Sequence, residues 1–249
     1  MFKRIEEMTL NSWPALHTSV YEGWLLRFAN GYTKRANSVS PLYGDEDDDI
    51  CMKVSYCEDV YKEAGQAVIF KITPYGGAGA LDDYLEQCGY ERVEPSCVQV
   101  RSLAGLERPT LQAISVNDVC SEEWLGLYAS LSGMSERNIR TAQQLLQAGR
   151  CKKGFFTLNV AGRPIAVGIG IIESGYVGLY DIIVEKASRN RGYAEQLILH
   201  ILQWAVENGA EHSFLQVVQS NEPALKLYSK LGYKMIYPYW YRVKKLHGD

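Results

Sequence analysis

The chain has 249 residues, of which 47% are hydrophobic and 22% charged, and its formal net charge is −3 at neutral pH. These values fit a globular protein with one large domain or two small ones, and they exclude a general electrostatic attraction to nucleic acid or to an anionic membrane surface. Because the sequence shows neither a signal peptide nor an apolar stretch of membrane-spanning length, we expect a cytoplasmic protein.

The first 40 residues predict a helix followed by a β-hairpin. Residues 1–30 combine a helical opening with the loosely alternating stretch Gly23–Phe28, which indicates a strand. Asn30 and Gly31 form a pair that is typical of hairpin turns, so we expect Thr33–Val39 to be the returning strand.

An acidic run follows at residues 45–49. Its alternating aspartates resemble the start of a calcium-binding loop, but such a loop needs a glycine at its sixth position and a glutamate at its twelfth, where this chain has Ile50 and Tyr56. We therefore predict a solvated loop whose acids favour the N-terminus of a helix from Ile50 to Ala64. The six cysteines form no Cys-x-x-Cys pair, which indicates reduced thiols. No metal is expected.

The first half then predicts a strand, a turn and a second helix. Gln66–Thr73 is rich in β-branched and aromatic residues, as strands are. The glycine-rich stretch 76–79 lacks the lysine and serine of a phosphate loop, so we expect a flexible turn there. A helix over Leu81–Cys88 follows, and Gly89 ends it.

The second half begins after a junction at Leu103–Pro109. Thr110–Ser115 predicts a strand, and Asn117 or Asp118 is placed to cap a helix that runs to about Leu131. A second helical stretch follows, and then three antiparallel strands joined by turns at 159–163 and 173–175. These elements are Ser135–Gly149, Phe155–Val160, Pro164–Ile172 and Tyr176–Val184.

The stretch after Val184 indicates an anion-binding turn. A polar segment leads to Gly192, and a helix with one apolar face runs from there to Gly209. The first N–H groups of a helix lack internal partners and carry partial positive charge, and glycine lets a ligand approach the backbone. Arg189 and Arg191 add formal positive charge. A strand over His212–Val218 and a helix from about Asn221 to Gly232 complete the pattern.

The sequence also contains an internal repeat with a constant spacing of 143 residues. At this spacing Gly89 matches Gly232, Tyr90 matches Tyr233, Pro95 matches Pro238 and Val100 matches Val243. Each copy predicts a helix, a glycine cap, a strand, a proline-containing bend and a strand. We infer that half of the chain was duplicated. At the same spacing the segment of Arg189 and Gly192 falls on the acidic residues 46–51, so the first copy would repel an anion.

Two motifs of the second half carry a resemblance to a known superfamily. Arg189-x-x-Gly192-x-Ala194 after a strand resembles motif A of the GNAT acyltransferases, and Asn221-x-x-Ala224-x-x-x-Tyr228-x-x-x-Gly232-Tyr233 is similar to their second signature. The resemblance covers about residues 110–245. It implies an α/β (α+β) fold with a mixed, mostly antiparallel central sheet flanked by helices. We expect this fold in tandem, as a degenerate lobe over 1–105 and a GNAT N-acetyltransferase domain over 108–249.

The resemblance also implies roles for particular residues. Backbone groups of the fourth strand would bond the pantetheine arm of acetyl-CoA, and the loop after it would wrap the pyrophosphate. Tyr228 would protonate the departing CoA thiolate or fill a groove, and Asn221 would contact the pantetheine region or cap its helix. The expected cofactor-binding residues are Ile182, Ile183, Val184, Arg189, Asn190, Arg191, Gly192, Tyr193, Ala194, Glu195, Asn221 and Tyr228.

No general base is identifiable in the sequence. The position that carries glutamate in histone-type members is Gly178 here, and the nearby Asp181 and Glu173 are equally suited to solvated or turn positions. A water relay to such a carboxylate, or an amine that arrives neutral, would also serve. His212 is better explained as a strand-edge residue.

These observations predict an N-acyltransferase that moves acetyl from acetyl-CoA to a primary amine by direct attack in a ternary complex. The alternative is a non-catalytic module that senses acyl-CoA or binds protein. The expected partners are acetyl-CoA and an amine acceptor, without nucleic acid or membrane. The first lobe would stand in for a second subunit and leave a monomer.

Overall fold

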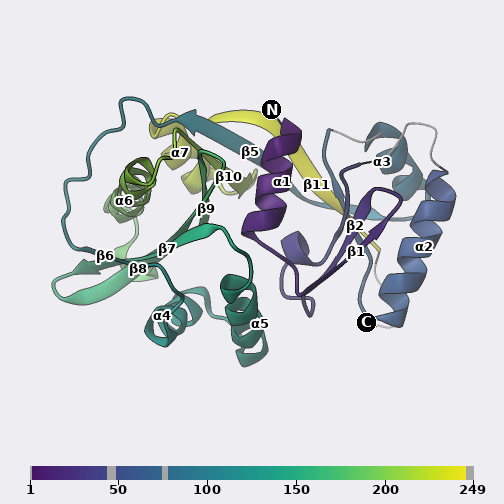
Figure 1. Ribbon diagram of the computed structural model, residues 1–249, viewed down its shortest axis with the longest axis horizontal. Helices are drawn as coiled ribbons and strands as arrows, with labels where there is room; N and C mark the ends of the chain where they lie inside the picture. The colour runs from purple at the N-terminus through teal and green to yellow at the C-terminus, as the bar shows by residue number, and fades with distance from the viewer. Residues whose placement is uncertain (1, 44–48, 75–77, 245–249) are drawn as a thin grey trace. The chain divides into compact units, whose positions relative to one another are not determined.

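The computed structural model describes residues 2–43, 49–74 and 78–244, which form two compact units (Figure 1). Unit 1 comprises residues up to Val98 together with Val217–Glu222 and the chain from Met235 onward. Unit 2 comprises Gln99–Gln216 and Pro223–Lys234. Both combine helices with a mostly antiparallel set of strands, as the sequence predicted. No helix in the described part of the chain is long and apolar enough to cross a membrane.

Unit 1 is a sheet with the strand order β1-β2-β3-β4-β11-β5. Strands β1, β2 and β3 pair antiparallel, β3 and β4 pair parallel, and β11 pairs antiparallel with β4. The elements are α1 (Phe2–Ser12), β1 (His17–Tyr21), β2 (Trp24–Phe28), the 3-10 helix η1 (Lys34–Ala36), β3 (Val39–Pro41), α2 (Ile50–Glu63), β4 (Ile69–Ile72), α3 (Ala78–Gln87), β5 (Glu91–Ser102) and β11 (Lys234–Val243).

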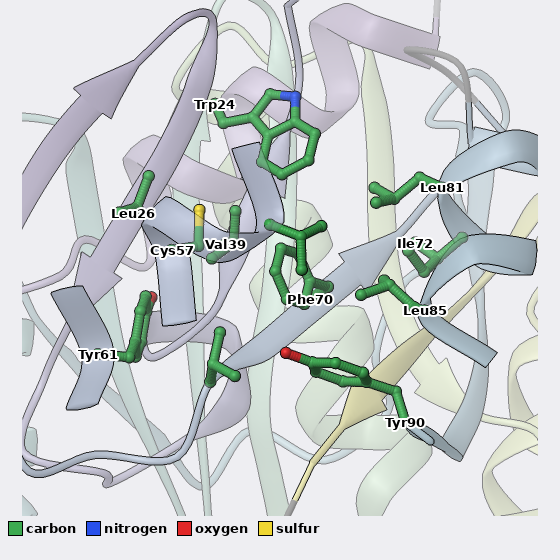
Figure 2. Packing of buried hydrophobic residues seen from close by; sticks show 12 residues of the cluster. Trp24, Leu26, Val39, Cys57, Tyr61, Phe70, Ile72, Leu81, Leu85 and Tyr90 are labelled. Carbon is green, nitrogen blue, oxygen red and sulfur yellow. The ribbon is translucent and has the colours of Figure 1, made fainter. Parts of the chain in front are cut away.

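The core of unit 1 fills one face of this sheet. Alternate strand residues such as Trp24, Leu26 and Phe70 point toward α2 and α3, since side chains on a strand alternate between the two faces (Figure 2). The Phe70 ring meets Trp24 and Tyr90 edge-on, with ring centroids 5.9 and 5.5 Å apart. Burial raises the pKa of the Tyr90 phenol well above its usual value, so the ring stays neutral in the folded state.

The other face of the same sheet is polar and lies against α1. Lys71 of β4 donates to Glu6 of α1 at 2.5 Å, and the Tyr237 hydroxyl donates to the second carboxylate oxygen at 2.7 Å. The Lys71 and Glu6 side chains are only 5% and 2% exposed. Burial lowers the pKa of Lys71, and the Glu6 carboxylate opposes that shift. The two charges therefore depend on each other.

Two predictions for the first half were wrong. The hairpin turn lies at Glu22-Gly23, between β1 and β2, and not at Asn30-Gly31. The returning strand is only β3, because the Asn37 side chain accepts hydrogen bonds from Ala29 and Gly31 N–H and donates to Thr33 O, which folds residues 29–37 into a loop. The expected turn at 76–79 falls partly outside the described residues, and Gly79 lies inside α3.

Unit 2 is a sheet with the strand order β5-β10-β9-β8-β7-β6, in which only the β10–β9 pair is given as parallel. In Figure 1, α4 and α5 lie on one side of β6–β8, and α6 lies on the other. The elements are β6 (Ile114–Asn117), α4 (Glu122–Ser132), α5 (Glu136–Gln147), β7 (Lys152–Val160), β8 (Arg163–Glu173), β9 (Tyr176–Val184), the 3-10 helix η2 (Lys186–Ser188), α6 (Tyr193–Glu207), β10 (His212–Val218) and α7 (Glu222–Lys230).

Close packing fixes which face of this sheet α6 covers. A side chain on Gly170 would place its Cβ 2.6 Å from Ile201 of α6, so β8 has glycine where the helix approaches. On the opposite face, Trp124 of α4 meets Phe155 edge-on at 5.1 Å, and its indole N–H donates to Phe156 O at 3.0 Å.

Three expectations for the second half also need correction. The first strand starts at Ile114 rather than Thr110, because Gln196 of α6 accepts hydrogen bonds from the N–H groups of Thr110 and Leu111. Asn117 pairs with Phe155 as the last residue of β6, so the cap of α4 is Ser121, whose hydroxyl accepts from Trp124 N–H at 3.1 Å. The proline-containing bends are absent, since β5 and β11 each run through their proline as one strand.

The 143-residue spacing seen in the sequence recurs in the structure. Helices α2 and α6 begin at Ile50 and Tyr193, strands β4 and β10 begin at Ile69 and His212, and both pairs have this spacing. Helices α3 and α7 are each followed by a glycine with φ 82, and the N–H groups of Tyr90 and Tyr233 then bond back to the carbonyls of Leu85 and Tyr228. Each copy therefore ends its helix with the same local geometry.

Candidate active site

The end of strand β9 separates from its neighbour β10. Their parallel pairing covers only Tyr176–Leu179 and His212–Leu215. Within the described pairing, the later residues Tyr180–Val184 contact only β8. The edge that carries Ile182, Ile183 and Val184 is therefore outside the β9–β10 ladder, and its backbone groups can bond another molecule.

A β-bulge lies at the same place. Val167 pairs with Ile183 and Ile169 with Tyr180, so β9 has one more residue than β8 over this interval. Asp181 takes up the extra length with φ 49, in the left-handed region that aspartate tolerates better than most residues. The bulge changes the direction of the backbone just before Ile182.

The loop after β9 is held in place from several sides. Arg163 makes two 2.7 Å bonds to the Glu185 carboxylate, which also accepts from Ser188 Oγ, and these donors hold the pKa of Glu185 below its usual value. Arg189 Nε donates to Val184 O at 3.1 Å. These bonds fix the entry to the segment Arg189–Gly192, whose side chains are exposed.

Helix α6 begins at Tyr193 without a side-chain cap. The residue at its N-cap is Gly192, with φ 79 and ψ −1, and no side chain within the described residues bonds the first turn there. The helix dipole gives this end partial positive charge, to which Arg189 and Arg191 add. Glu195 in the first turn is paired with Lys230 at 2.6 Å, so its negative charge is compensated. The arrangement fits an anionic group such as a pyrophosphate.

The corresponding helix of unit 1 has the opposite design. Asp49, 143 residues before Gly192, caps α2 by accepting a hydrogen bond from Met52 N–H at 3.1 Å. A carboxylate therefore already occupies the N-terminus of α2, and it would repel a second anion. Residues 45–48 of the acidic run lie outside the described residues. No group of three or more His, Cys, Asp or Glu that could hold a metal occurs in the described chain.

Tyr228 lies on α7, in the same unit as the loop. It is half-buried, and its ring meets that of Tyr233 edge-on at 5.8 Å. Burial raises the pKa of Tyr228 to about 12. The phenol therefore stays protonated across the physiological range and can donate a hydrogen bond to a thiolate.

The remaining candidates are placed as follows. Asn221 is exposed, directly precedes α7 and belongs to unit 1, so its role toward the loop stays a prediction. Glu173 accepts from the Cys151 thiol at 3.7 Å, and the His212 ring stacks on Tyr176 at 4.9 Å. None of these contacts marks a general base.

Sequence reasoning missed the bulge and the early end of the β9–β10 pairing. The only local signal is Asp181, where the alternation of β9 gives way to a continuous apolar run. The register of three strands decides both features, and a pattern along one strand does not contain it.

Comparisons with known proteins agree with this geometry. Residues 2–241 match a family model described as "Probable histone acetyltransferase Rv0428c C-terminal". A protein of Bacillus subtilis (strain 168) named "Uncharacterized N-acetyltransferase YobR" is 31% identical over 251 residues, which are 98% of each chain.

Solved structures share the fold. A GCN5-related N-acetyltransferase from Kribbella flavida superposes with a TM-score of 0.74 at 14% identity, over 98% of this chain and 95% of that one. A tandem GNAT protein from the clavulanic acid biosynthesis pathway does so with a TM-score of 0.66 at 11% identity, over 96% and 87%. The family match over nearly the whole chain shows that this protein belongs to that acetyltransferase family and to the GNAT superfamily.

Proposed function

We propose that the protein transfers the acetyl group of acetyl-CoA to a primary amine in a ternary complex. The observation that carries the proposal is the uncapped, glycine-started N-terminus of α6, next to two exposed arginines and after a strand with an open edge. Arg189–Glu195 would hold the pyrophosphate, and backbone groups of Ile182–Val184 would bond the pantetheine arm. Asn221 would contact the same arm.

The chemistry requires little from the protein beyond positioning and one proton donor. The amine nitrogen attacks the thioester carbonyl carbon, a C–N bond forms, and the C–S bond then breaks. Tyr228 donates a hydrogen bond to the departing sulfur. Because the pKa of Tyr228 is about 12, above that of a thiol, the phenol stabilises the thiolate mainly by this hydrogen bond.

Calorimetry and a thiol-release assay test the proposal. Acetyl-CoA and CoA should both bind, and a panel of amines and peptides should release CoA thiol from acetyl-CoA. Absence of CoA binding would reject the proposal. Binding without thiol release from any acceptor would instead favour the non-catalytic sensing module, for which the lack of a carboxylate at Gly178 is the supporting observation.

Replacement of Tyr228 by phenylalanine should lower turnover by about 10- to 100-fold. A hydrogen bond to a charged group contributes about 1.5–3 kcal/mol, which corresponds to this range. The dissociation constant of CoA should stay unchanged. Since the active form is protonated and the pKa of Tyr228 is about 12, its ionisation should cause no loss of activity below about pH 10.

The control for this variant is Tyr176→Phe, which removes a phenol from the paired part of β9. It should leave turnover within about twofold of the wild type, as surface changes usually do. Equal turnover in Tyr228→Phe and the wild type would show that Tyr228 only packs against Tyr233.

We also propose that unit 1 derives from a duplicated copy that kept its shape and lost its cofactor site. The recurring 143-residue spacing and the Asp49 cap of α2 support this. In this proposal the first copy replaces a second subunit, so light scattering should give the mass of one 28.0 kDa chain.

A further inference from the structure

The sheet of unit 2 carries a second group of polar and aromatic side chains where the β9–β10 pairing ends. The last pair is Leu215 with Leu179. Tyr180 on β9 and Gln216 on β10 are the first residues beyond it. No role follows for either of them from the motifs of the sequence.

These side chains lie on the face of the sheet away from α6. Gly170 pairs with Leu179, and Gly170 is the residue that α6 approaches, so the α6 face is the one that carries Leu179. Gly178 and Tyr180, one position to either side, point the other way. A Cβ on Gly178 would lie 2.6 Å from the Tyr180 ring and 2.8 Å from the Phe214 ring. Gln216, two residues after Phe214, shares their face.

Gln216 has an unmet hydrogen-bonding need. Its side-chain Nε2 is buried and has no hydrogen-bond partner within the described residues. A buried amide donor without an acceptor is unfavourable, so this position is suited to a ligand that brings a carbonyl oxygen.

The aromatic residues form a stiff boundary beside that amide. Tyr180 and Phe214 are 3% and 1% exposed, and their rings meet edge-on with centroids 6.4 Å apart. The Tyr180 ring lies directly on Gly178, where any side chain would displace it. The position of the ring is therefore fixed by the absence of a β-carbon at residue 178.

We propose that this face is the subsite for the acyl end of acyl-CoA, an inference that rests on the proposed function. An arm that starts at the N-terminus of α6 and passes between β9 and β10 beyond their last pair emerges on the opposite face, next to Tyr180. Gln216 Nε2 donates a hydrogen bond to the thioester carbonyl oxygen. The Tyr180 ring limits the acyl chain to a few carbons, which makes Tyr180 a specificity-determining residue.

Calorimetric titration with free CoA, acetyl-CoA and hexanoyl-CoA tests both parts. The wild type should bind acetyl-CoA at least about 10-fold more tightly than hexanoyl-CoA. In Tyr180→Ala, hexanoyl-CoA should bind at least about 10-fold more tightly than it does to the wild type, because added methylenes find apolar room. Tyr180→Phe keeps the ring and should keep the wild-type preference. Identical preferences in Tyr180→Ala and Tyr180→Phe would overturn the size limit.

Gln216→Leu tests the hydrogen bond. The ratio of acetyl-CoA affinity to free CoA affinity should fall by about 3- to 10-fold, the range of one hydrogen bond. An unchanged ratio would overturn this role for Gln216, including the case in which both ligands bind more weakly to the same extent.

Two further measurements keep the result interpretable. If Tyr180→Ala does not fold, as judged by circular dichroism, Gly178→Ala replaces it, because the new Cβ displaces the ring from the other side. The acyl-length preference of Gly178→Ala must then differ from that of the wild type, or the size limit is wrong. Failure of the wild type to bind free CoA would reject the proposed function itself, whereas CoA binding that ignores acyl length and Gln216 rejects only the subsite.

Discussion

Replacement of Gly192 by glutamate is expected to weaken acetyl-CoA binding by about 100-fold or more. Gly192 has φ 79, a conformation that costs a residue with a side chain about 1–2 kcal/mol. The added carboxylate would also compete for the helix N-terminus and repel a pyrophosphate, as Asp49 does in the first copy. Together these effects reach about 3 kcal/mol, or a factor of about 100 in the dissociation constant measured by calorimetry.

Two other glycine variants separate charge from backbone strain. Gly192→Ala has the strain without the charge and should lose much less affinity. Gly162→Glu adds the same charge at another exposed glycine, with φ 75 and open space around it, in the turn between β7 and β8. It should bind acetyl-CoA as the wild type does. Equal binding by Gly192→Glu and Gly162→Glu would show that the α6 N-terminus holds no anion.

Replacement of Glu6 by leucine is expected to lower the free energy of unfolding by about 3–5 kcal/mol, because it leaves Lys71 buried without its carboxylate. Tyr237 also loses its hydrogen-bond acceptor. Lys71 then has a pKa further below that of the unfolded chain, which binds more protons. The stability of this variant, measured by denaturant unfolding, should therefore rise with pH toward the unfolded pKa of about 10.4.

The double variant Glu6→Leu/Lys71→Met provides the comparison. Replacing a buried ion pair by apolar side chains is often close to neutral, so the double variant should recover most of the lost stability. Lys34→Met breaks the exposed pair with Glu94 and should cost less than about 1 kcal/mol. A double variant as unstable as Glu6→Leu would mean that the destabilisation does not come from the unpaired lysine.

Much of the fold follows from local patterns in the sequence. Helices α2 and α6 and strand β10 have nearly the predicted bounds, because their periodicity and end residues lie within the elements themselves. The loop at Asn30-Gly31 was mistaken for a hairpin turn because the bonds of Asn37, several residues later, decide its shape. Asn117 was mistaken for a cap because its strand partner Phe155 is distant in the sequence.

The candidate site divides in the same way. Gly192 and the arginines beside it could be found because glycine before an amphipathic helix is a local signal. The bulge at Asp181 and the position of Gln216 could not, since both depend on where the pairing of β9 with β8 and β10 shifts or stops. The raised pKa of Tyr228 depends on burial that α7 acquires only in the folded chain.

The membership of the terminal strands has a consequence for biosynthesis. Strand β11 is nearly the last segment to be translated, yet it pairs with β4, and Met235–Asp249 belong to unit 1. Gln99–Ser102, the end of β5, belong to unit 2 although the rest of β5 belongs to unit 1. The N-terminal segment cannot complete its own sheet as it leaves the ribosome. It must wait, with the edge of β4 unpaired, until the last residues of the chain arrive.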